Sequence, residues 1–417
     1  MLPVIDATLS QSEPCNSASK PEFRPITASF VTVMPSPYTQ DLFTAMHRDG
    51  RIRPRVYYLE MAAPDTRWGN VPLAEYERVL PGFWLPFLAG RVHFNRGAIR
   101  AIAADRPDVV VVGGYMTFTT QVVMRWLHKK RIPWIFWGEM PGMRQRHGFG
   151  AALRSIAQRP VSRWPNGIAA IGSRAAAAYR QMTHARCPVA NIPYCCDMKP
   201  FFDIRRERRE DSADLRFLYC GQLIYRKGVD LLVEAFCESA RFFPGIVLTL
   251  VGDGPLRGDL ESQIPASLRN RIRFAGFRPV ADLPRFFAET DVFVLPSRHD
   301  GWGVVVNQAI AAGLPVICSD AVGAGADLVA DGVNGRVIPA GSCPGLISAI
   351  RSFCNQPSRT LEFGVCSRNR AMEWTPGRVV DQWHELCELA LAQIDSRRRT
   401  VGVPPEAVLE RRAAPVG

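Results

Sequence analysis

The chain has 417 residues, 47% of them hydrophobic, 22% charged and 10% aromatic, which suits two globular domains and excludes a chain that is disordered throughout. There are 51 Lys and Arg against 39 Asp and Glu, so the formal net charge is +12 and anionic partners such as nucleotides, phosphates or acidic lipid headgroups are favoured. The basic clusters contain few aromatic residues and match no zinc-finger, RRM or zipper pattern, so nucleic acid is not expected as a partner.

The N-terminal half alternates strands with helices. Residues 1–25 are rich in Ser and Pro and are expected to be disordered. The spacing of the apolar runs that follow is typical of a parallel sheet with right-handed crossovers. The predicted strands are 26–34, 55–59, 109–112, 133–137 and 167–171, and the predicted helices lie near 42–46, 96–104 and 121–127 and begin again at Ser173.

The alternation breaks at 191–210, which we interpret as a connector, and restarts at Leu215. A final helix over 376–394 is long enough to cross back to the first half, and the tail 395–417 is expected to be disordered. We predict an α/β fold of two Rossmann-like, doubly wound domains, residues 26–200 and 211–375, with the final helix completing the first. The predicted strands of the second domain are 215–220, 247–251, 272–275, 292–295 and 316–318, and its predicted helices include 283–289 and 304–312.

One apolar run does not fit this alternation. Residues 79–89, VLPGFWLPFLA, are too few to span a bilayer and are interrupted by Pro81, Gly82 and Pro86. The run is compatible with a segment lying in a membrane surface or with a loop packed inward, and we expect the inward-packed loop.

The cysteines and the N-terminus indicate the cellular compartment. Eleven cysteines are scattered without a Cys-x-x-Cys pair, which argues against a disulfide framework and against a zinc site. The N-terminal segment lacks a basic region followed by an apolar core, so no signal peptide is expected. We predict a cytoplasmic protein without a metal or other cofactor, able to make peripheral contact with the inner face of a membrane.

The segment 295–320 contains the strongest candidate site. Its tetrapeptide DGWG, residues 300–303, forms a turn between a strand and a helix, and the two glycines let the backbone approach a ligand closely. The helix from about Val304 aims free N–H groups back at this turn, where an anion is stabilised. Asp300 and Gln308 lie eight residues apart, a little over two helical turns, so both side chains reach the same side of a ligand. A glycine-capped strand-to-helix connection that binds no ligand has the same sequence pattern.

Four segments of the second half follow one another as GQLIYRKGVDLLVEAF, LVGDGP, RIRFAGF and SRHDGWGVVVNQAIAAGLPVI. In this order and near this spacing they resemble the family 4 glycosyltransferases, retaining enzymes of the GT-B fold. NIPYCCD resembles the family's interdomain connector, and 374–391 resembles its terminal crossing helix. The resemblance implies a nucleotide-diphospho-sugar donor, of UDP or GDP type, bound mainly by the second domain. It implies a glycan or lipid-linked acceptor bound by the first domain, in cell-surface polysaccharide biosynthesis.

The resemblance also implies roles for individual residues. Arg226 and Lys227 become candidates for holding the diphosphate, because a leaving group with about two negative charges needs fixed cations. Asp300 corresponds to the residue that contacts the transferred sugar. Glu139, at the C-terminal edge of a strand, is expected to contact the acceptor or the sugar. The other expected donor contacts are Gly221, Gln222, Phe277, Gly301, Trp302, Gly303, Val304, Val305 and Gln308.

Several of these residues have a purely structural alternative. Arg226 and Lys227 are compatible with a solvated pair at the start of a helix. Phe277, which falls where the family lines the nucleobase, is compatible with a core phenylalanine. Glu139 is compatible with a surface ion pair, and His147 is a weaker candidate for the acceptor site.

The chain departs from the family pattern at three places. The family signature is a pair of glutamates, E-x(7)-E, where this chain has Asp300 and Gln308. Charge-assisted hydrogen bonds are roughly twice as strong as neutral ones, so Gln308 weakens binding of the nucleotide ribose by about 1 kcal/mol. Gln222 stands where the family often has Arg, and 34–38, MPSPY, stands where it often has a glycine-rich loop.

Three functions are compatible with these observations. The first is sugar transfer with retention of configuration, in which the departing diphosphate helps to remove the acceptor's proton. The second, motivated by Gln222 and Gln308, is a relative that binds a sugar nucleotide without transferring it. The third is a nicotinamide-dependent oxidoreductase, but neither 113–114 nor 252–254 supplies G-x-G-x-x-G with an acidic residue about 20 positions later.

Overall fold

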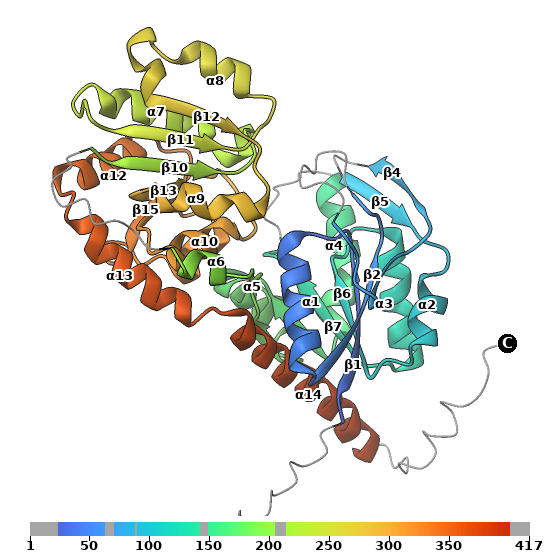
Figure 1. Cartoon of the computed structure of the whole chain (residues 1–417). Helices are drawn as coiled ribbons and strands as arrows, with labels where there is room; N and C mark the ends of the chain where they lie inside the picture. Colours follow the sequence, from blue (N-terminus) through green and yellow to red (C-terminus); the bar gives the residue numbers. More distant parts are fainter. Residues whose placement is uncertain (1–23, 63–70, 88–89, 142–148, 205–213, 401–417) are drawn as a thin grey trace, which may run out of the picture.

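The computed structural model of the chain describes residues 24–62, 71–87, 90–141, 149–204 and 214–400 (Figure 1). They form two halves, each a parallel sheet flanked by helices, which are linked by a connector and by the last helix. The predicted α/β architecture of two doubly wound units is confirmed. Two segments predicted to be disordered lie largely outside the described residues. They are residues 1–23 of the N-terminal segment and residues 401–417 of the C-terminal tail.

The N-terminal sheet has seven strands in the order β3-β2-β1-β6-β7-β8-β9, all paired in parallel. Strand β6 (Val109–Gly113) is buried over its whole length, as expected of a parallel strand covered by helices on both faces. The other strands are β1 (Ile26–Thr32), β2 (Ile52–Tyr58), β3 (Glu77–Val79), β7 (Trp134–Gly138), β8 (Gly167–Ala170) and β9 (Val189–Asn191). The helices are α1 (Pro37–Asp49), α2 (Ala98–Ala104), α3 (Phe118–Lys130), α4 (Phe149–Arg163) and α5 (Ser173–Thr183).

Helix α1 begins at a capping box. The Ser36 hydroxyl accepts a hydrogen bond from the Thr39 amide, and the Thr39 hydroxyl accepts one from the Ser36 amide. The helix ends at Gly50, whose φ of 82° lies in the left-handed region that favours glycine. The segment 34–38 is thereby fixed at the C-terminal edge of the sheet, where ligands bind in such folds.

The C-terminal sheet has six parallel strands in the order β12-β11-β10-β13-β14-β15. It follows a short helix, α6 (Lys199–Phe202), which lies in the connector predicted at 191–210. Its strands are β10 (Arg216–Cys220), β11 (Val247–Val251), β12 (Ile272–Gly276), β13 (Val292–Leu295), β14 (Val316–Ser319) and β15 (Gly335–Ile338). Its helices are α7 (Val229–Ala240), α8 (Arg257–Gln263), α9 (Leu283–Ala288), α10 (Val305–Ala311), α11 (Gly323–Leu328), α12 (Cys343–Asn355) and α13 (Arg359–Met372).

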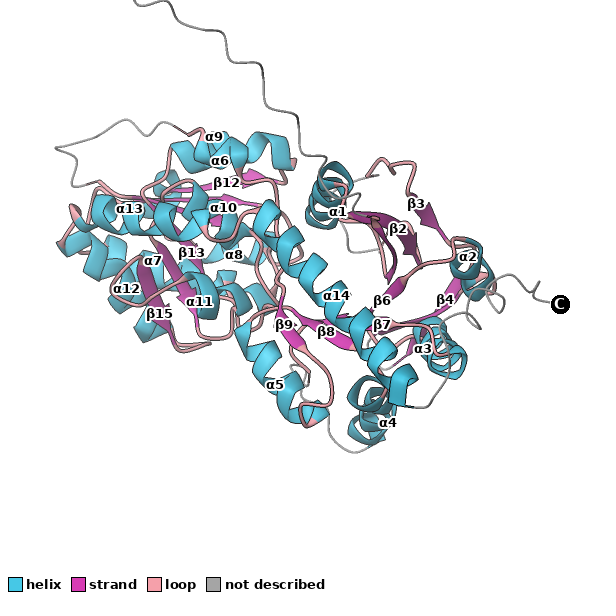
Figure 2. Cartoon of the chain, turned by 90° about the horizontal axis from the view of Figure 1, so that it is seen from below, coloured by secondary structure: helices cyan, strands magenta, loops and turns pink. Residues whose placement is uncertain are grey.

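The last helix, α14 (Pro376–Thr400), crosses from the C-terminal half to the N-terminal half (Figure 2). Trp383 on this helix is buried, with its ring 5.4 Å from that of Phe30 and 5.6 Å from that of Trp137. The predicted crossing helix is therefore confirmed. It continues to Thr400, six residues beyond the predicted end at Ile394.

From Phe83 to Phe87 the apolar run is not the inward-packed loop that the sequence predicted. Within it, β4 (Phe83–Phe87) pairs in antiparallel fashion with β5 (Gly90–Phe94) to form a separate hairpin. All five residues of β4 are exposed. Apolar content alone does not reveal whether a segment faces the core or solvent, which is why the expectation was wrong.

Candidate active site

The turn at 300–303 is held by the segment that follows β14. The Asp300 amide donates to the Ala321 carbonyl at 3.1 Å, and the Gly323 amide donates to the Asp300 carbonyl at 3.1 Å. Gly303 has a φ of 91°, which requires glycine. The turn therefore has a fixed backbone before any ligand binds.

Three of the candidate residues, Asp300, Arg226 and Lys227, lie together in the structure. The Lys227 Nζ lies 2.5 Å from Asp300 Oδ2, and the Arg226 Nη1 lies 3.9 Å from Asp300 Oδ1. The side chains of Lys227 and Asp300 are 15% and 10% exposed. The Arg226 side chain is more open, at 39% exposed. Two cations meet one carboxylate, so the cluster retains a positive charge for an anionic ligand.

The 3₁₀ turn at Tyr225–Lys227 is tied to the neighbouring turn by backbone contacts. The Arg226 Nη1 donates to the His299 carbonyl at 3.0 Å, and the Arg298 amide donates to the Arg226 carbonyl at 2.9 Å. Gly228, with a φ of 68°, approaches the Pro296 carbonyl so closely that a β-carbon would lie 2.1 Å from its oxygen. These contacts place both cations beside the Asp300 turn.

Glu139 reaches the same turn from the N-terminal half. A β-carbon built on Gly301 would lie 2.1 Å from the Glu139 Cδ, so the carboxyl group rests against the Gly301 backbone. The Glu139 carbonyl accepts a hydrogen bond of 2.7 Å from the Tyr179 hydroxyl. Glu139 thus lies just after β7 and contacts the Asp300 turn of the other half.

Tyr38 is a part of the site that the sequence reasoning missed. Its pKa is raised to about 12, mainly by desolvation; a hydrogen bond with Ser36 lowers the pKa, and the nearby carboxylates of Glu139 and Asp300 contribute to the rise. Its ring lies 4.9 Å from that of Tyr194. The phenol is therefore protonated at neutral pH and stands near both carboxylates. Its position in the first turn of α1, directly after the loop that follows β1, was the available signal.

The expected nucleotide contacts lie along the edge formed by β10, β11 and β12. The Gly221 amide donates to the Val251 carbonyl at 2.9 Å, and the Gln222 carbonyl accepts from the Tyr219 hydroxyl at 2.7 Å. Phe277 is 43% exposed, so it is not the core phenylalanine of the alternative interpretation. Its exposed ring is free to stack on a base.

Two expected contacts lie deeper than predicted. Trp302 is 1% exposed, and its Nε1 donates to Asn307 Oδ1 at 2.9 Å. Its ring also packs against Gly172, where a β-carbon would lie 3.2 Å from Cζ3. The Trp302 side chain thus belongs to the core, and only its backbone is at the turn. Gln308, on α10, is 6% exposed.

The start of α10 agrees with the prediction. The helix begins at Val305 with Val304 as its N-cap, directly after Gly303, and Val304 and Val305 are both partly buried. The first N–H groups of this helix therefore point toward the Asp300 turn. His147 lies outside the described residues.

A cavity of about 360 Å³ lies between the two halves, beside the turn. The N-terminal half contributes Met140, Ile171, Gly172, Arg174 and Ala175, and the C-terminal half contributes Arg298, His299, Gly301, Asp320, Ala321 and Gly323. Because Gly301 lines this cavity, it is continuous with the place where Glu139 meets the turn. A ligand bound there contacts both halves.

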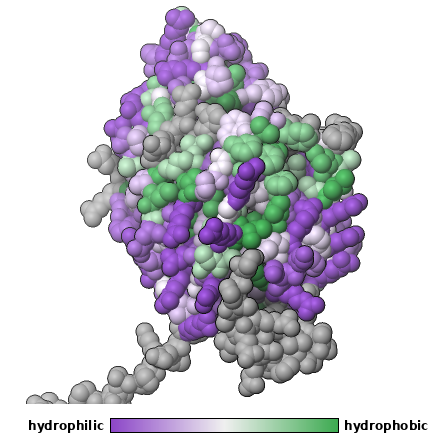
Figure 3. Space-filling view, turned by 90° about the vertical axis from the view of Figure 1, so that its right-hand side faces the viewer, coloured by the Kyte–Doolittle hydropathy of each residue, from purple (hydrophilic) through white to green (hydrophobic). Residues whose placement is uncertain are grey.

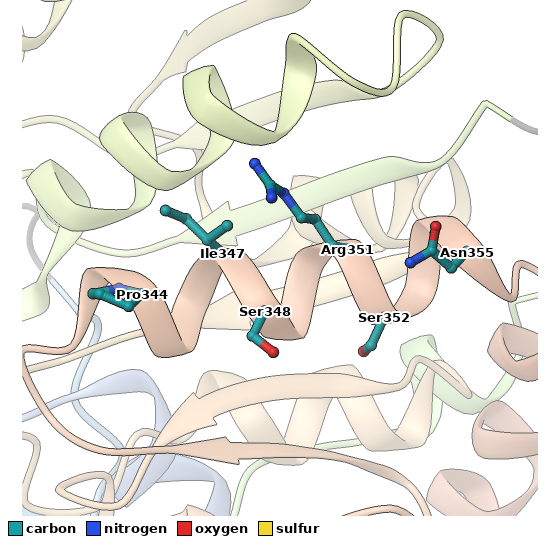
Figure 4. A pocket seen from close by; sticks show the side chains of 6 residues that line it. All are labelled: Pro344, Ile347, Ser348, Arg351, Ser352 and Asn355. Carbon is teal, nitrogen blue, oxygen red and sulfur yellow. The ribbon is translucent and has the colours of Figure 1, made fainter.

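A second hollow, of about 560 Å³, lies on α12 (Figure 4). Its Arg351 lies 4.4 Å from the ring of Phe242 and donates to the Glu238 carbonyl at 3.4 Å, so this side chain already has partners. No residue of this hollow lines the cavity at the Asp300 turn. Its lining residues are Pro344, Ile347, Ser348, Arg351, Ser352 and Asn355.

The described residues contain neither a group of side chains suited to a metal ion nor a helix suited to spanning a membrane. Within the described residues, no group of three or more His, Cys, Asp and Glu side chains is arranged to hold a metal ion. None of the helices in the described ranges combines the length and apolarity needed to cross a bilayer.

Comparison with solved structures identifies the fold. Sucrose-phosphate synthase from Thermosynechococcus elongatus superposes with a TM-score of 0.68 over 89% of this chain and 100% of that one, at 18% sequence identity. The two Rossmann-like halves thus have the GT-B arrangement that the sequence predicted.

Sequence comparison identifies relatives that match part of the chain. The alpha-D-kanosaminyltransferase of Streptomyces kanamyceticus is 32% identical over 34% of this chain and 36% of its own length. A GDP-mannose-dependent alpha-(1-6)-phosphatidylinositol monomannoside mannosyltransferase of Mycolicibacterium smegmatis is 29% identical over 40% of this chain and 46% of its own length. The chain thus spans less than half the length of these two relatives. Residues 214–356, which include Arg226, Lys227 and Asp300, match the family model described as Glycosyl transferases group 1.

Proposed function

We propose that the protein is a retaining glycosyltransferase that moves a sugar from a nucleotide-diphospho-sugar to a glycan or lipid-linked acceptor. The observation that carries this proposal is the meeting of Lys227 and Arg226 with the poorly solvated carboxylate of Asp300, opposite Glu139. Residues 211–375 then form the donor-binding domain, and residues 26–200, completed by α14, form the acceptor-binding domain.

The diphosphate is held by the two cations. On binding, its oxygens compete with Asp300 for Lys227 and Arg226, which lie 2.5 and 3.9 Å from that carboxylate. Charge that develops on the leaving phosphate is then stabilised by fixed groups that need little reorganisation. The amides of Gly303, Val304 and Val305 supply further donors at the start of α10.

The sugar lies between the two carboxylates. Asp300, released from Lys227, accepts hydrogen bonds from sugar hydroxyls, and Glu139 approaches from the acceptor side. The acceptor hydroxyl attacks the anomeric carbon as the bond to the phosphate oxygen breaks, and that oxygen receives the hydroxyl proton. Attack and departure on one face retain the configuration, and positioning supplies most of the rate.

The nucleotide extends along β10, β11 and β12. The exposed ring of Phe277 is placed to stack on the base, and the Gly221–Gln222 turn lies beside the phosphates. The donor named for the mannosyltransferase relative is GDP-mannose, which supports a nucleotide-diphospho-sugar without choosing between UDP and GDP types. We place the reaction in the cytoplasm, at the inner face of a membrane when the acceptor is lipid-linked.

A donor screen tests this function. The full chain is incubated with UDP- and GDP-sugars and with glycan and lipid-linked acceptors, and released UDP or GDP is measured. We expect acceptor-dependent release with at least one donor. Tight binding without release from any pair would instead support the sugar-nucleotide-binding relative that Gln222 and Gln308 suggest.

A further inference from the structure

The β4–β5 hairpin carries apolar side chains on its outer face. Paired residues of two strands share a face, and successive residues alternate between faces. Phe83 pairs with Phe94, and Leu85 pairs with Val92, so these side chains lie on one face together with Phe87. We call these five residues the apolar face of the hairpin.

The apolar face is not covered by the rest of the described protein. Phe83, Leu85 and Phe87 are 56%, 52% and 43% exposed. The ring of Phe94 lies 5.3 Å from that of Phe83 and 5.0 Å from that of Phe118, a residue of α3. The Phe118 residue is 54% exposed. The row of rings therefore continues from the hairpin onto the neighbouring helix.

The opposite face of the hairpin is anchored. Arg91 Nη2 lies 3.0 Å from Glu60 Oε1, and His93 Nε2 lies 3.3 Å from Glu60 Oε2. Glu60 follows β2, and both it and His93 are buried. Because this face is tied to the sheet, the apolar face is held pointing away from the protein.

The surroundings of the hairpin are basic. Between residues 78 and 104 the sequence contains Arg78, Arg91, Arg96 and Arg100 and neither Asp nor Glu. Arg78, Arg96 and Arg100 are exposed, while Arg91 lies 5.6 Å over the ring of Trp84. Figure 3 looks onto this side of the molecule, where hydrophobic residues gather in the middle and hydrophilic ones surround them.

We propose that the apolar face docks on an anionic lipid bilayer, with its rings and Leu85 in the boundary between headgroups and acyl chains and the arginines on lipid phosphates. A hairpin with aromatic and aliphatic residues on one side and cations beside them suits this boundary. This inference names the surface for the membrane contact in the proposed function and does not depend on sugar transfer.

A second copy of the chain fits this surface less well. Three side chains that are 43–56% exposed offer on the order of 300 Å², since a large aromatic side chain buries roughly 150–250 Å². A stable protein interface buries roughly 800 Å² on each partner. The repeated positive charge of Arg78, Arg96 and Arg100 also opposes contact between two copies of this face.

Cosedimentation of the full chain with vesicles tests the proposal. We expect binding to vesicles that mix phosphatidylcholine with phosphatidylglycerol, and much weaker binding to phosphatidylcholine alone. Leu85→Ser combined with Phe87→Ser should lower the partition coefficient about tenfold. Leu361→Ser is the matched control, because Leu361 is 45% exposed on α13, in the other half.

The contribution of the arginines to vesicle binding is tested separately. Arg96→Gln and Arg100→Gln should each lower the partition coefficient about fivefold. Arg269→Gln, at an exposed position of the C-terminal half, should leave it unchanged. Melting temperatures close to that of the unchanged protein establish that each variant folds.

Three results would overturn the proposal. They are absence of binding to anionic vesicles, equal binding by the hairpin variants and the controls, and a dimer of the unchanged protein that Leu85→Ser dissociates. Nucleotide release with a water-soluble acceptor is measured on the same variants. If release persists while vesicle binding fails, the docking surface is wrong and the proposed function stands.

Discussion

The carboxyl group of Glu139 rests against the backbone of Gly301, although the two residues come from opposite halves of the chain. A β-carbon at Gly301 would lie 2.1 Å from the Glu139 Cδ. Glu139 follows β7 and Gly301 follows β13, and each therefore stands at the C-terminal edge of its own parallel sheet. The two binding edges of the fold meet at this contact, next to Asp300.

Replacing Gly301 by Ala should lower turnover at least tenfold. The new methyl group overlaps the Glu139 carboxyl, which is the end of a flexible side chain and moves aside, so folding is kept while the carboxylate is displaced. Steady-state turnover and the melting temperature are measured together. Gly258→Ala is the control, because a β-carbon there meets nothing within 4 Å. Unchanged turnover in Gly301→Ala would argue against a role for Glu139.

Replacing Gln308 by Glu should strengthen donor binding. A carboxylate accepts a stronger hydrogen bond from the ribose than an amide does, so the donor KM should fall about fivefold, equivalent to ~1 kcal/mol. Position 308 is only 6% exposed, so the free variant buries an uncompensated charge and should melt at a lower temperature. Added nucleotide should raise the melting temperature of the variant most of the way back to that of the unchanged protein. A donor KM equal to that of the unchanged protein would show that residue 308 does not contact the ribose.

Replacing Asp327 by Ala should loosen the contact between the halves. Asp327 Oδ2 accepts a 2.9 Å hydrogen bond from the Ser173 amide, so a side chain of the C-terminal half caps helix α5 of the N-terminal half. Loss of a cap costs about 1 kcal/mol, which lowers the melting temperature by roughly 1 °C in a protein of this size, because the entropy of unfolding grows with chain length. Asp327→Asn keeps an acceptor and should lose less. Identical melting temperatures for the Ala variant and the unchanged protein would contradict the capping role.

The pH dependence of stability should reveal the partly buried phenol of Tyr38. Its pKa rises from 10.0 to about 12 in the folded protein, mainly through desolvation, so the folded state keeps its proton more tightly than the unfolded state. The stabilisation is complete below pH 10 and is lost as pH rises toward 12, by about 2–3 kcal/mol. Unfolding free energies of the unchanged protein and Tyr38→Phe are compared across this range. The difference between them should change with pH by that amount, and parallel curves would contradict the assignment.

The sequence predicted those parts of the site whose conformation depends on neighbouring residues in the chain. The strand, turn and helix around 300–303 follow from glycine spacing and apolar runs, and Gly303 does adopt a left-handed φ of 91°. That Arg226 and Lys227 meet Asp300 depended on the resemblance, because no local rule brings together residues more than 70 positions apart. The deep burial of Trp302 was not predictable, since a tryptophan between two glycines fits a ligand surface and a core equally well.

Two features of the fold escaped prediction for different reasons. Helix α4 (Phe149–Arg163) was not among the predicted helices, and it contains Pro160, which ordinarily argues against a helix. The β4–β5 hairpin was mistaken for a loop packed inward because an apolar strand looks the same whether its face meets the core or solvent. Only the anchoring of Arg91 and His93 on Glu60 reveals its direction.

Isothermal titration of UDP and GDP into the unchanged protein and Lys227→Ala tests the central claim most directly. Lys227 lies 2.5 Å from Asp300 in a poorly solvated cluster, so its removal leaves the diphosphate without its nearest cation. We predict that one of the two nucleotides binds the unchanged protein and that Lys227→Ala weakens this binding at least thirtyfold, since a hydrogen bond to a charged group contributes about 2 kcal/mol or more. Arg269→Ala, far from the turn in sequence and exposed, is the control and should bind as the unchanged protein does. Equal affinity of Lys227→Ala and the unchanged protein would contradict the assignment of the diphosphate site.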